Sequence, residues 1–195
     1  MLMLLVAAAL LSLERLFYIL ISHRPDAIRA RAFTLISKEP LALVRALFIT
    51  FKVIQVGVFA AWCLAFGDAP WWTPSAPPAE LAIAVAMLIV GQALNLSVFV
   101  RLGPKGVFYA CELGHEVPYV ESFPFSWFQH PQYVGTVLSI WAAFLAMRFP
   151  NPDWFVLPML ETTFYVIGAR LERPGHAEHA LVPTLGSARS AMEEP

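Results

Sequence analysis

Charged residues are scarce in this sequence. Only 14% of its 195 residues are Asp, Glu, Lys or Arg, whereas 58% are hydrophobic, and the mean hydropathy is +0.64. Soluble domains carry about 25% charged and about 45–50% apolar residues. The composition therefore excludes an ordinary soluble domain and indicates an integral membrane protein, of a length that suits one domain.

Basic charge and cysteine are limited as well. Thirteen Lys and Arg against 14 Asp and Glu give a net charge of −1, which offers no cationic surface for nucleic acid. The two cysteines, Cys63 and Cys111, do not make a disulfide framework. We therefore expect no nucleic-acid partner and two free thiols.

No basic segment precedes the first apolar run, whose first charges are Glu14 and Arg15. Because a cleavable signal peptide normally begins with a basic region, we expect residues 1–22 to stay in the mature protein. Internal repeats are also absent, so nothing favours a transporter built from inverted repeats.

Long hydrophobic runs are what the sequence does contain. An apolar helix of about 20 residues spans the hydrocarbon core, and on that measure we find five runs, at 1–22, 41–66, 81–101, 133–149 and 153–171. They predict an all-α, multispan transmembrane helical bundle. The last two are separated by Pro150, Asn151 and Pro152 alone, which predicts a C-terminal helical hairpin. We expect one membrane domain over 1–180 and a mobile cytoplasmic tail over 181–195.

The loops predict an orientation. Segment 23–40 contains four Lys or Arg residues and 67–80 contains none, so the first is expected in the cytoplasm and the second outside. With five spans, the N-terminus lies outside, and 102–132 shares the cytoplasmic face with the chain beyond Arg170. The host membrane is either the bacterial inner membrane or the endoplasmic reticulum.

The stretch 101–135 is too rich in glycine and polar residues for its apolar surroundings. Gly103 and Gly106 allow positive φ and close approach of a ligand to the backbone, although a plain helix break has the same pattern. Arg101 or Lys105 could hold a phosphate, or Lys105 could simply sit among lipid headgroups.

A second group of candidates follows in F-P-F-S-W-F-Q-H-P-Q-Y-V-G, residues 123–135. Pro131 predicts that His130 stands at the start of the fourth helix, where it and Tyr133 could contact a ligand; a structural histidine and an interfacial tyrosine are the alternatives. Phe123 and Phe125 could stack on a cationic group or be buried among acyl chains.

The fifth run places polar residues on one helical face. Glu161, Tyr165, Gly168 and Glu172 are spaced four, three and four residues apart. A carboxylate at the depth of Glu161 is costly, so it should be protonated, paired with a base such as Lys52 or Arg45, or hydrated. Glu172 could equally be a solvated charge.

Other polar residues within the runs have plainer interpretations. Glu14 and Arg15 can be accommodated by snorkelling or by packing against a neighbour, and Lys52 and Gln55 should face protein or water. His176 and His179 flank Glu178 in H-A-E-H, but no further ligand has matching spacing. We expect no metal site.

Together these motifs resemble the phospholipid N-methyltransferase family, whose members methylate phosphatidylethanolamine. The resemblance covers about 102–174 and is carried by L-G-P-K-G-V-F, F-P-F, H-P-Q-Y-V-G and L-E-R-P. More faintly, S-L-E-R-L-F-Y near the start is similar to the family's first helix. The related isoprenylcysteine carboxyl methyltransferases have an R-H-P-x-Y-x-G element that residues 130–135 resemble.

The resemblance implies S-adenosylmethionine as the cofactor, a membrane phospholipid as the substrate and an active site on the cytoplasmic face. It implies cofactor contacts by Gly103, Gly106, His130, Pro131, Tyr133, Gly135 and Glu172. Arg101, Lys105, Phe123 and Phe125 would bind the lipid, and Glu161, His130 and Tyr133 would serve catalysis, with Glu161 or His130 as the proton acceptor. The chain differs from the family at Arg173, where a second glutamate is expected, and at Ala110 and Cys111, where close relatives have Gly-Asp.

Other functions stay open at this point. An isoprenylcysteine-type carboxyl methyltransferase is the main alternative, and membrane sterol reductases have a loosely similar H-P-x-Y element and use a nicotinamide cofactor. A transporter or scaffold could use Glu161, Lys52 and Arg45 as a polar pathway. Assembly into a homo-oligomer is also open.

Overall fold

A computed structural model describes residues 1–35, 39–67, 70, 73–108, 113, 115 and 120–171, with the backbone alone for 31–35, 104 and 105. Within these residues the chain forms helices and no strand. The helices are α1 (Leu2–His23), α2 (Pro25–Leu35), α3 (Pro40–Phe66), α4 (Pro78–Val107), α5 (Pro131–Arg148) and α6 (Val156–Leu171). The predicted all-α bundle of five hydrophobic helices is confirmed.

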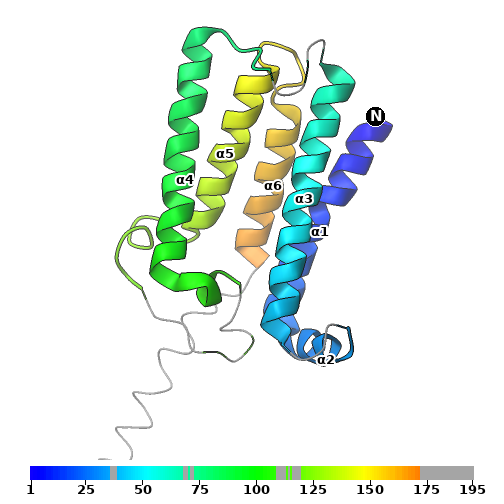
Figure 1. Cartoon of the computed structure of the whole chain (residues 1–195), viewed down its shortest axis with the longest axis vertical. Helices are drawn as coiled ribbons and strands as arrows, with labels where there is room; N and C mark the ends of the chain where they lie inside the picture. Colours follow the sequence, from blue (N-terminus) through cyan, green and yellow to red (C-terminus); the bar gives the residue numbers. More distant parts are fainter. Residues whose placement is uncertain are drawn as a thin grey trace, which may run out of the picture.

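The five long helices run lengthwise beside one another (Figure 1). Helix α4 packs on α5, α5 on α6, α6 on α1, and α1 on α3. Since α5 and α6 are antiparallel neighbours joined by a short connection, the predicted C-terminal hairpin is confirmed. In this arrangement α3 and α4 are not a closely packed pair within the described residues.

Helix α2 lies across one end of the bundle (Figure 1), in a segment that the sequence predicted only as a basic connection. Pro25 occupies its first position, where a missing N–H is harmless, and Asp26 in the first turn complements the helix dipole. One turn later, Arg29 Nη1 donates to Asp26 Oδ1 over 3.1 Å. These local signals account for a helix that a search for apolar runs misses.

Helices α1, α3 and the part of α4 up to Gly103 are long and apolar enough to cross a membrane, so the chain is a membrane protein. Helix α5, with 18 residues, and α6, with 16, are about 27 and 24 Å long at 1.5 Å per residue, slightly short of a ~30 Å hydrocarbon core. Helix α6 begins at Val156 rather than at 153, because Asp153 accepts the Val156 N–H in a turn.

Two apolar clusters fill the interior at different heights. One, nearer α2, includes Ile21, Val44 and Leu102. The other, nearer the α5–α6 connection, is built around residues such as Leu11 and Phe144. Leu11 and Ile21 belong to the same helix, so the residues of α1 between them lie between the clusters. Glu14 and Arg15, two buried charged residues, lie at that intermediate level.

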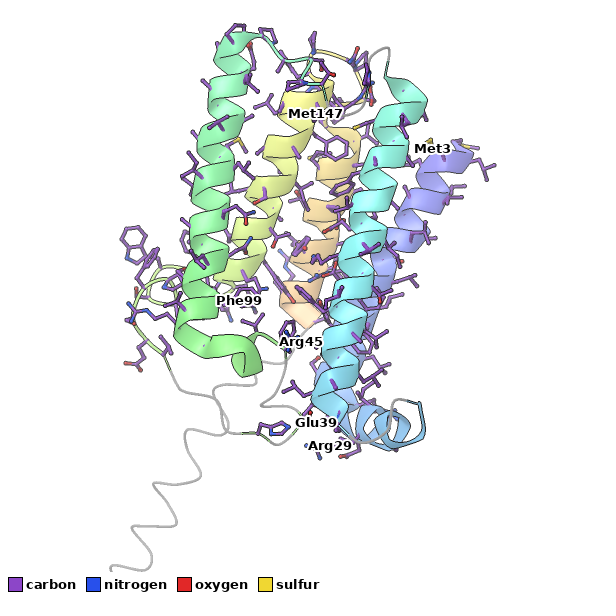
Figure 2. All side chains as sticks on the ribbon, viewed as in Figure 1. Met3, Arg29, Glu39, Arg45, Phe99 and Met147 are labelled. Atoms are coloured by element: carbon purple, nitrogen blue, oxygen red, sulfur yellow. The ribbon has the colours of Figure 1, made fainter. Side chains whose placement is uncertain are left out.

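The α5–α6 connection is fixed to α3. Arg148 donates to Asp153 Oδ1 over 2.6 Å and to the Phe66 carbonyl over 2.6 Å, and Trp62 Nε1 donates to Asp153 Oδ2 over 2.8 Å. Burial raises the pKa of Asp153, but these hydrogen bonds and the Arg148 charge outweigh it and hold the pKa below its ordinary value. These contacts therefore hold the α5–α6 connection against α3 at the end of the bundle near Met3 and Met147 (Figure 2).

The opposite end carries α2, the end of α4, the start of α5 and the end of α6 (Figure 1). Arg29 and Glu39 mark it in Figure 2. Among the described residues that sequence topology assigned to one face, those at the end of α4, the start of α5 and the end of α6 lie at this end of the bundle. Which side of the membrane this end faces stays a prediction.

Candidate functional site

A buried ion cluster joins α1 to α3. Glu14 and Arg15 are only 5% and 4% exposed. Glu14 Oε1 lies 2.9 Å from Lys52 Nζ and 2.9 Å from Arg15 Nη2. Buried charges are tolerated when they are paired, and here one carboxylate meets two cations. The sequence left snorkelling and packing as alternatives for this pair, and the structure places both residues against neighbours inside the bundle.

Three tyrosine rings surround the guanidinium of Arg15. Its Cζ lies 4.8 Å from the ring centroid of Tyr18, 4.9 Å from that of Tyr133 and 4.1 Å from that of Tyr165. Rings at this range attract a cation and restrict its movement. One nitrogen, Nη1, is buried without a hydrogen-bond partner in the described part of the chain.

Gln55 extends the polar network to α6. Lys52 Nζ donates to Gln55 Oε1 over 3.2 Å and to the Tyr165 hydroxyl over 3.3 Å, and Gln55 Nε2 donates to Glu161 Oε1 over 2.6 Å. The expectation that Lys52 and Gln55 face protein is confirmed. Of the three alternatives for Glu161, pairing with Lys52 or Arg45 is not observed among the described residues, because an amide holds the carboxylate and Arg45 is exposed on α3 (Figure 2).

A cavity of about 400 Å³ adjoins this network, within the range of small-ligand pockets. All five long helices line it, and Phe99, labelled in Figure 2, does so from α4. The polar lining is formed by Glu14, Arg15, Tyr18, Lys52, Gln55, Gln92, Asn95, Gln132, Tyr133, Thr136, Ser139 and Tyr165. The apolar lining is formed by Phe48, Phe59, Phe99, Val107, Ile140 and Ala143.

The start of α5 lies beside this cavity. His130 is the N-cap and Pro131 the first helical residue, as the sequence predicted. The ring of Tyr133 stacks on that of His130 at 5.4 Å and also meets the Tyr165 ring edge-on at 5.2 Å. Tyr133 therefore contacts His130 at the start of α5 and also lines the cavity deeper in the bundle.

Gly103 breaks α4 near its end. Its backbone has φ 67° and ψ 177°, a region open in practice only to glycine, so the expected positive φ is confirmed there. A Cβ at this position would meet nothing within 4 Å, which leaves room for a ligand beside the backbone. Gly106 lies three residues later in the turned end of the helix.

Gly135 has a packing position that the sequence did not reveal. A Cβ on it would lie 2.6 Å from the Gly91 carbonyl oxygen and 2.8 Å from Asn95 Oδ1. Small residues permit such close crossings between membrane helices, and α4 and α5 are the most extensively packed pair. Its predicted contact with the cofactor stays a prediction.

The remaining predicted residues are spread more widely. Arg101 is exposed near the end of α4. Lys105 lies on α4 just after the bend at Gly103, and the structure describes its backbone but not its side chain. Phe123 is 43% exposed and stacks edge-on with Trp127, whereas Phe125 packs on the apolar cluster near α2. Glu172 lies outside the described residues, as do Ala110, Cys111, Arg173, the H-A-E-H segment and the tail over 181–195.

Sequence reasoning gave Glu14 and Arg15 no role in the site and considered Lys52 only as a partner of Glu161 or as part of a transport pathway. One signal was present, because S-L-E-R-L-F-Y was noted as similar to a family helix. Their shared location depends on pairings across 38 positions of sequence, which no local pattern gives. Among the described residues, no group of three or more His, Cys, Asp or Glu side chains could hold a metal ion.

A profile of the phospholipid methyltransferase family matches residues 79–179. The chain belongs to this family. It is also 39% identical over 56 residues to an Arabidopsis thaliana phosphatidyl-N-methylethanolamine N-methyltransferase, which is 29% of this chain and 34% of that protein. The chain thus aligns with about a third of the length of that relative. No solved structure matches.

The phospholipid methyltransferase match covers α4, α5 and α6, including the bend at Gly103 and the start of α5. The ion cluster on α1 and α3 lies outside the matched residues. The site residues predicted from the sequence, from Arg101 to Glu172, therefore lie within the matched range, whereas Glu14, Arg15 and Lys52 lie before it.

Proposed function

We propose that the protein transfers a methyl group from S-adenosylmethionine to the amine of phosphatidylethanolamine or of its mono- and dimethyl derivatives. The observation that carries this proposal is the position of Tyr133 within a chain of the phospholipid methyltransferase family. This residue contacts His130 at the end of the bundle where cofactor residues were predicted, and it lines a cavity inside the membrane helices.

The residues at that end fit the cofactor. The left-handed backbone of Gly103 and the open space beside it permit close approach of a polar ligand. Gly106, His130, Pro131, Tyr133 and, beyond the described residues, Glu172 would complete the contacts, with Gly135 behind them. When bound, the sulfonium supplies an activated methyl group, and the protein's task is orientation and electrostatics.

The acceptor amine must lose a proton before it attacks, and the geometry favours His130 over Glu161 for this task. His130 is in ring contact with a residue of the cavity wall. Glu161 is 2% exposed, is held by Gln55 and does not line the cavity. Glu14 does line it, but two cations occupy its carboxylate.

Lipid would enter from the same end. Arg101, exposed at the end of α4, is placed to attract a phosphate at headgroup level, with Lys105 nearby on the chain. Phe123, exposed beside Trp127, is suited to contact acyl chains, and Phe125 anchors that segment to the core. This face would be the cytoplasmic one according to the basic residues around α2.

The test is incubation of the purified protein with labelled S-adenosylmethionine and, separately, phosphatidylethanolamine and its monomethyl and dimethyl derivatives, followed by lipid separation. Label should appear in one or more of the three lipids. A prenylcysteine acceptor tests the carboxyl methyltransferase alternative, and thermal stabilisation by S-adenosylhomocysteine but not by NADPH separates both from a reductase. Label in none of the phospholipids would overturn the proposal.

A further inference from the structure

A residue of the cavity wall, Arg15, has a buried hydrogen-bond donor with no partner among the described residues. Arg15 is 4% exposed, and its Nη1 meets no acceptor in the described part of the chain. The other terminal nitrogen, Nη2, binds Glu14, and the three tyrosine rings hold the guanidinium in place. Leaving a buried charged donor unmet is unfavourable, so a fixed donor on a residue that lines a cavity indicates a ligand that accepts from it.

The charges of the lining favour an anionic group beside Arg15. One carboxylate, Glu14, and two cations, Arg15 and Lys52, are the acidic and basic side chains that line the cavity, which leaves a charge of +1. A guanidinium nitrogen is suited to a phosphate or carboxylate oxygen. The cavity thus matches a ligand with one negative charge placed near Arg15.

A second unmet atom calls for the opposite chemistry. Asn95, on α4, lines the same cavity, and its Oδ1, which is buried beside Gly135, has no hydrogen-bond partner among the described residues. A carbonyl oxygen accepts hydrogen bonds, so it would be satisfied by an N–H donor. A ligand with an anionic group near Arg15 and an N–H donor near Asn95 would be a zwitterion.

The surroundings favour a lipid headgroup over the cofactor's own carboxylate. Gly103, Gly106 and His130, where the cofactor is proposed, do not line this cavity. Its apolar wall includes Phe48 and Phe99, on α3 and α4, two helices that do not pack closely on each other. These apolar side chains would contact the glycerol backbone and its acyl chains.

We propose that this cavity binds the zwitterionic headgroup of the acceptor phospholipid, with its phosphodiester on Arg15 Nη1 and its amine on Asn95 Oδ1. This assignment rests on the proposed function and adds a substrate site to it. Arg15 lies eight residues before the end of α1, about 12 Å along the helix, so the headgroup is drawn below the membrane surface. The polar side chains of Gln132 and Thr136, near the start of α5, line its path.

Binding of three short-chain lipids to the detergent-solubilised protein tests the assignment without relying on catalysis. The probes are dihexanoyl phosphatidylethanolamine, dihexanoyl phosphatidylmethanol, which lacks the amine, and dihexanoylglycerol, which lacks the phosphate. Wild type should bind the first about tenfold or more tightly than the third, the scale of one charge-assisted hydrogen bond. Arg15→Gln should abolish that preference, and Asn95→Ala should abolish the preference for the amine over phosphatidylmethanol.

Arg24→Gln is the matched control, because Arg24 is exposed at the end of the same helix, and it should leave both preferences intact. If Arg15→Gln does not fold, Arg15→Lys keeps the charge but loses the planar fork and should reduce the phosphate preference about threefold or more. A folded Arg15 variant that keeps the full preference would overturn the assignment. So would a variant that loses affinity for S-adenosylhomocysteine and keeps its lipid preference.

The binding result is independent of turnover. Intact lipid preferences in a wild-type protein that labels no phospholipid would refute the proposed function and leave the headgroup site standing. Label transfer by a protein whose lipid preferences do not depend on Arg15 or Asn95 would support the function and refute the site.

Discussion

Tyr133 stacks its ring on His130, with centroids 5.4 Å and planes 17° apart, and the same tyrosine lies 4.9 Å from the Arg15 guanidinium. One side chain therefore connects the start of α5, where the cofactor is proposed, with the cavity assigned to the lipid. Methyl transfer requires the two partners in line and within contact. A residue shared by both compartments is placed to set that alignment.

Replacing His130 should reduce turnover. His130→Ala removes the ring that stacks on Tyr133 and the polar contact predicted for the cofactor, so turnover and affinity for S-adenosylhomocysteine should each fall roughly tenfold or more. Glu172→Gln should also reduce turnover and affinity for S-adenosylhomocysteine. Glu172 lies outside the described residues, so this expectation rests on the family resemblance of the sequence alone. The exposed neighbour Gln129 provides the control, Gln129→Ala. Near-normal activity of either site variant in purified form would contradict its assignment.

Gly103→Ala should destabilise the bend of α4. The added Cβ has open space around it, so steric contact is no obstacle, but φ 67° with ψ 177° is strained for any other residue, at a cost of order 1–3 kcal/mol. Cofactor affinity should fall with it as the bend relaxes. Gly57→Ala is the matched control, because Gly57 also has free space but lies within the helix α3, where alanine is favoured.

Thermal unfolding and S-adenosylhomocysteine titration of the two alanine variants in the same detergent decide the matter. Gly103→Ala should lower both the midpoint of thermal unfolding and the affinity for S-adenosylhomocysteine, whereas Gly57→Ala should lower neither. Equal midpoints and affinities for the two variants would show that the bend does not need glycine.

Gly135→Ala should separate α4 from α5. Its Cβ would stand 2.6 Å from the Gly91 carbonyl oxygen, a backbone atom that cannot rotate away, so the helices must shift. Overpacking of this kind costs typically about 1–3 kcal/mol. The midpoint of thermal unfolding should drop relative to wild type and to Gly57→Ala. An unchanged midpoint would mean that the helices are not in close contact there.

These examples show which parts of the molecule could be predicted from the sequence. Each of the five apolar runs became a helix, because the thickness of a bilayer dictates their length. The positive φ of Gly103 and the helix start at Pro131 could be expected, since glycine and proline restrict the backbone locally. The placement of Gly103 and Pro131 at the same end of the bundle followed from the number of predicted membrane spans.

The ion cluster could not be predicted in the same way. Lys52 meets Glu14 across 38 positions and Gln55 meets Glu161 across 106, so these pairings depend on which faces of α1, α3 and α6 adjoin. Sequence spacing gives the face of one helix but not its neighbour. That is why the sequence left Glu161 with three alternatives and did not predict the amide of Gln55 beside it.

The hydrogen bonds that Asp153 accepts from Arg148 and Trp62 should make stability depend on pH. The folded pKa of Asp153 is held below its ordinary value of 3.8, so its contribution is complete above that value and is lost as pH falls through the folded pKa. Asp153→Asn should therefore lower the thermal midpoint at neutral pH, and the gap to wild type should narrow as pH drops below 3.8. Glu121→Gln, at an exposed position, should show no such gap. A gap that stays constant with pH would contradict this role.

The last prediction concerns the charges of the ion cluster. Glu14→Gln leaves Arg15 and Lys52 as neighbouring cations without a counter-charge, and breaking a buried ion pair on one side costs on the order of 3 kcal/mol. The loss should be smaller for Lys52→Met, because Arg15 still faces Glu14 and the Lys52 side chain is 31% exposed, where water screens its charge.

The double variant Glu14→Gln, Lys52→Met should recover part of the loss caused by Glu14→Gln, since it removes one of the two unpaired cations. Residues in contact give non-additive effects of this kind, whereas unconnected residues would give simple sums. Thermal unfolding of the two single variants, the double variant and the exposed control Glu121→Gln measures the difference. Strictly additive losses would show that Lys52 does not neutralise Glu14 in the folded protein.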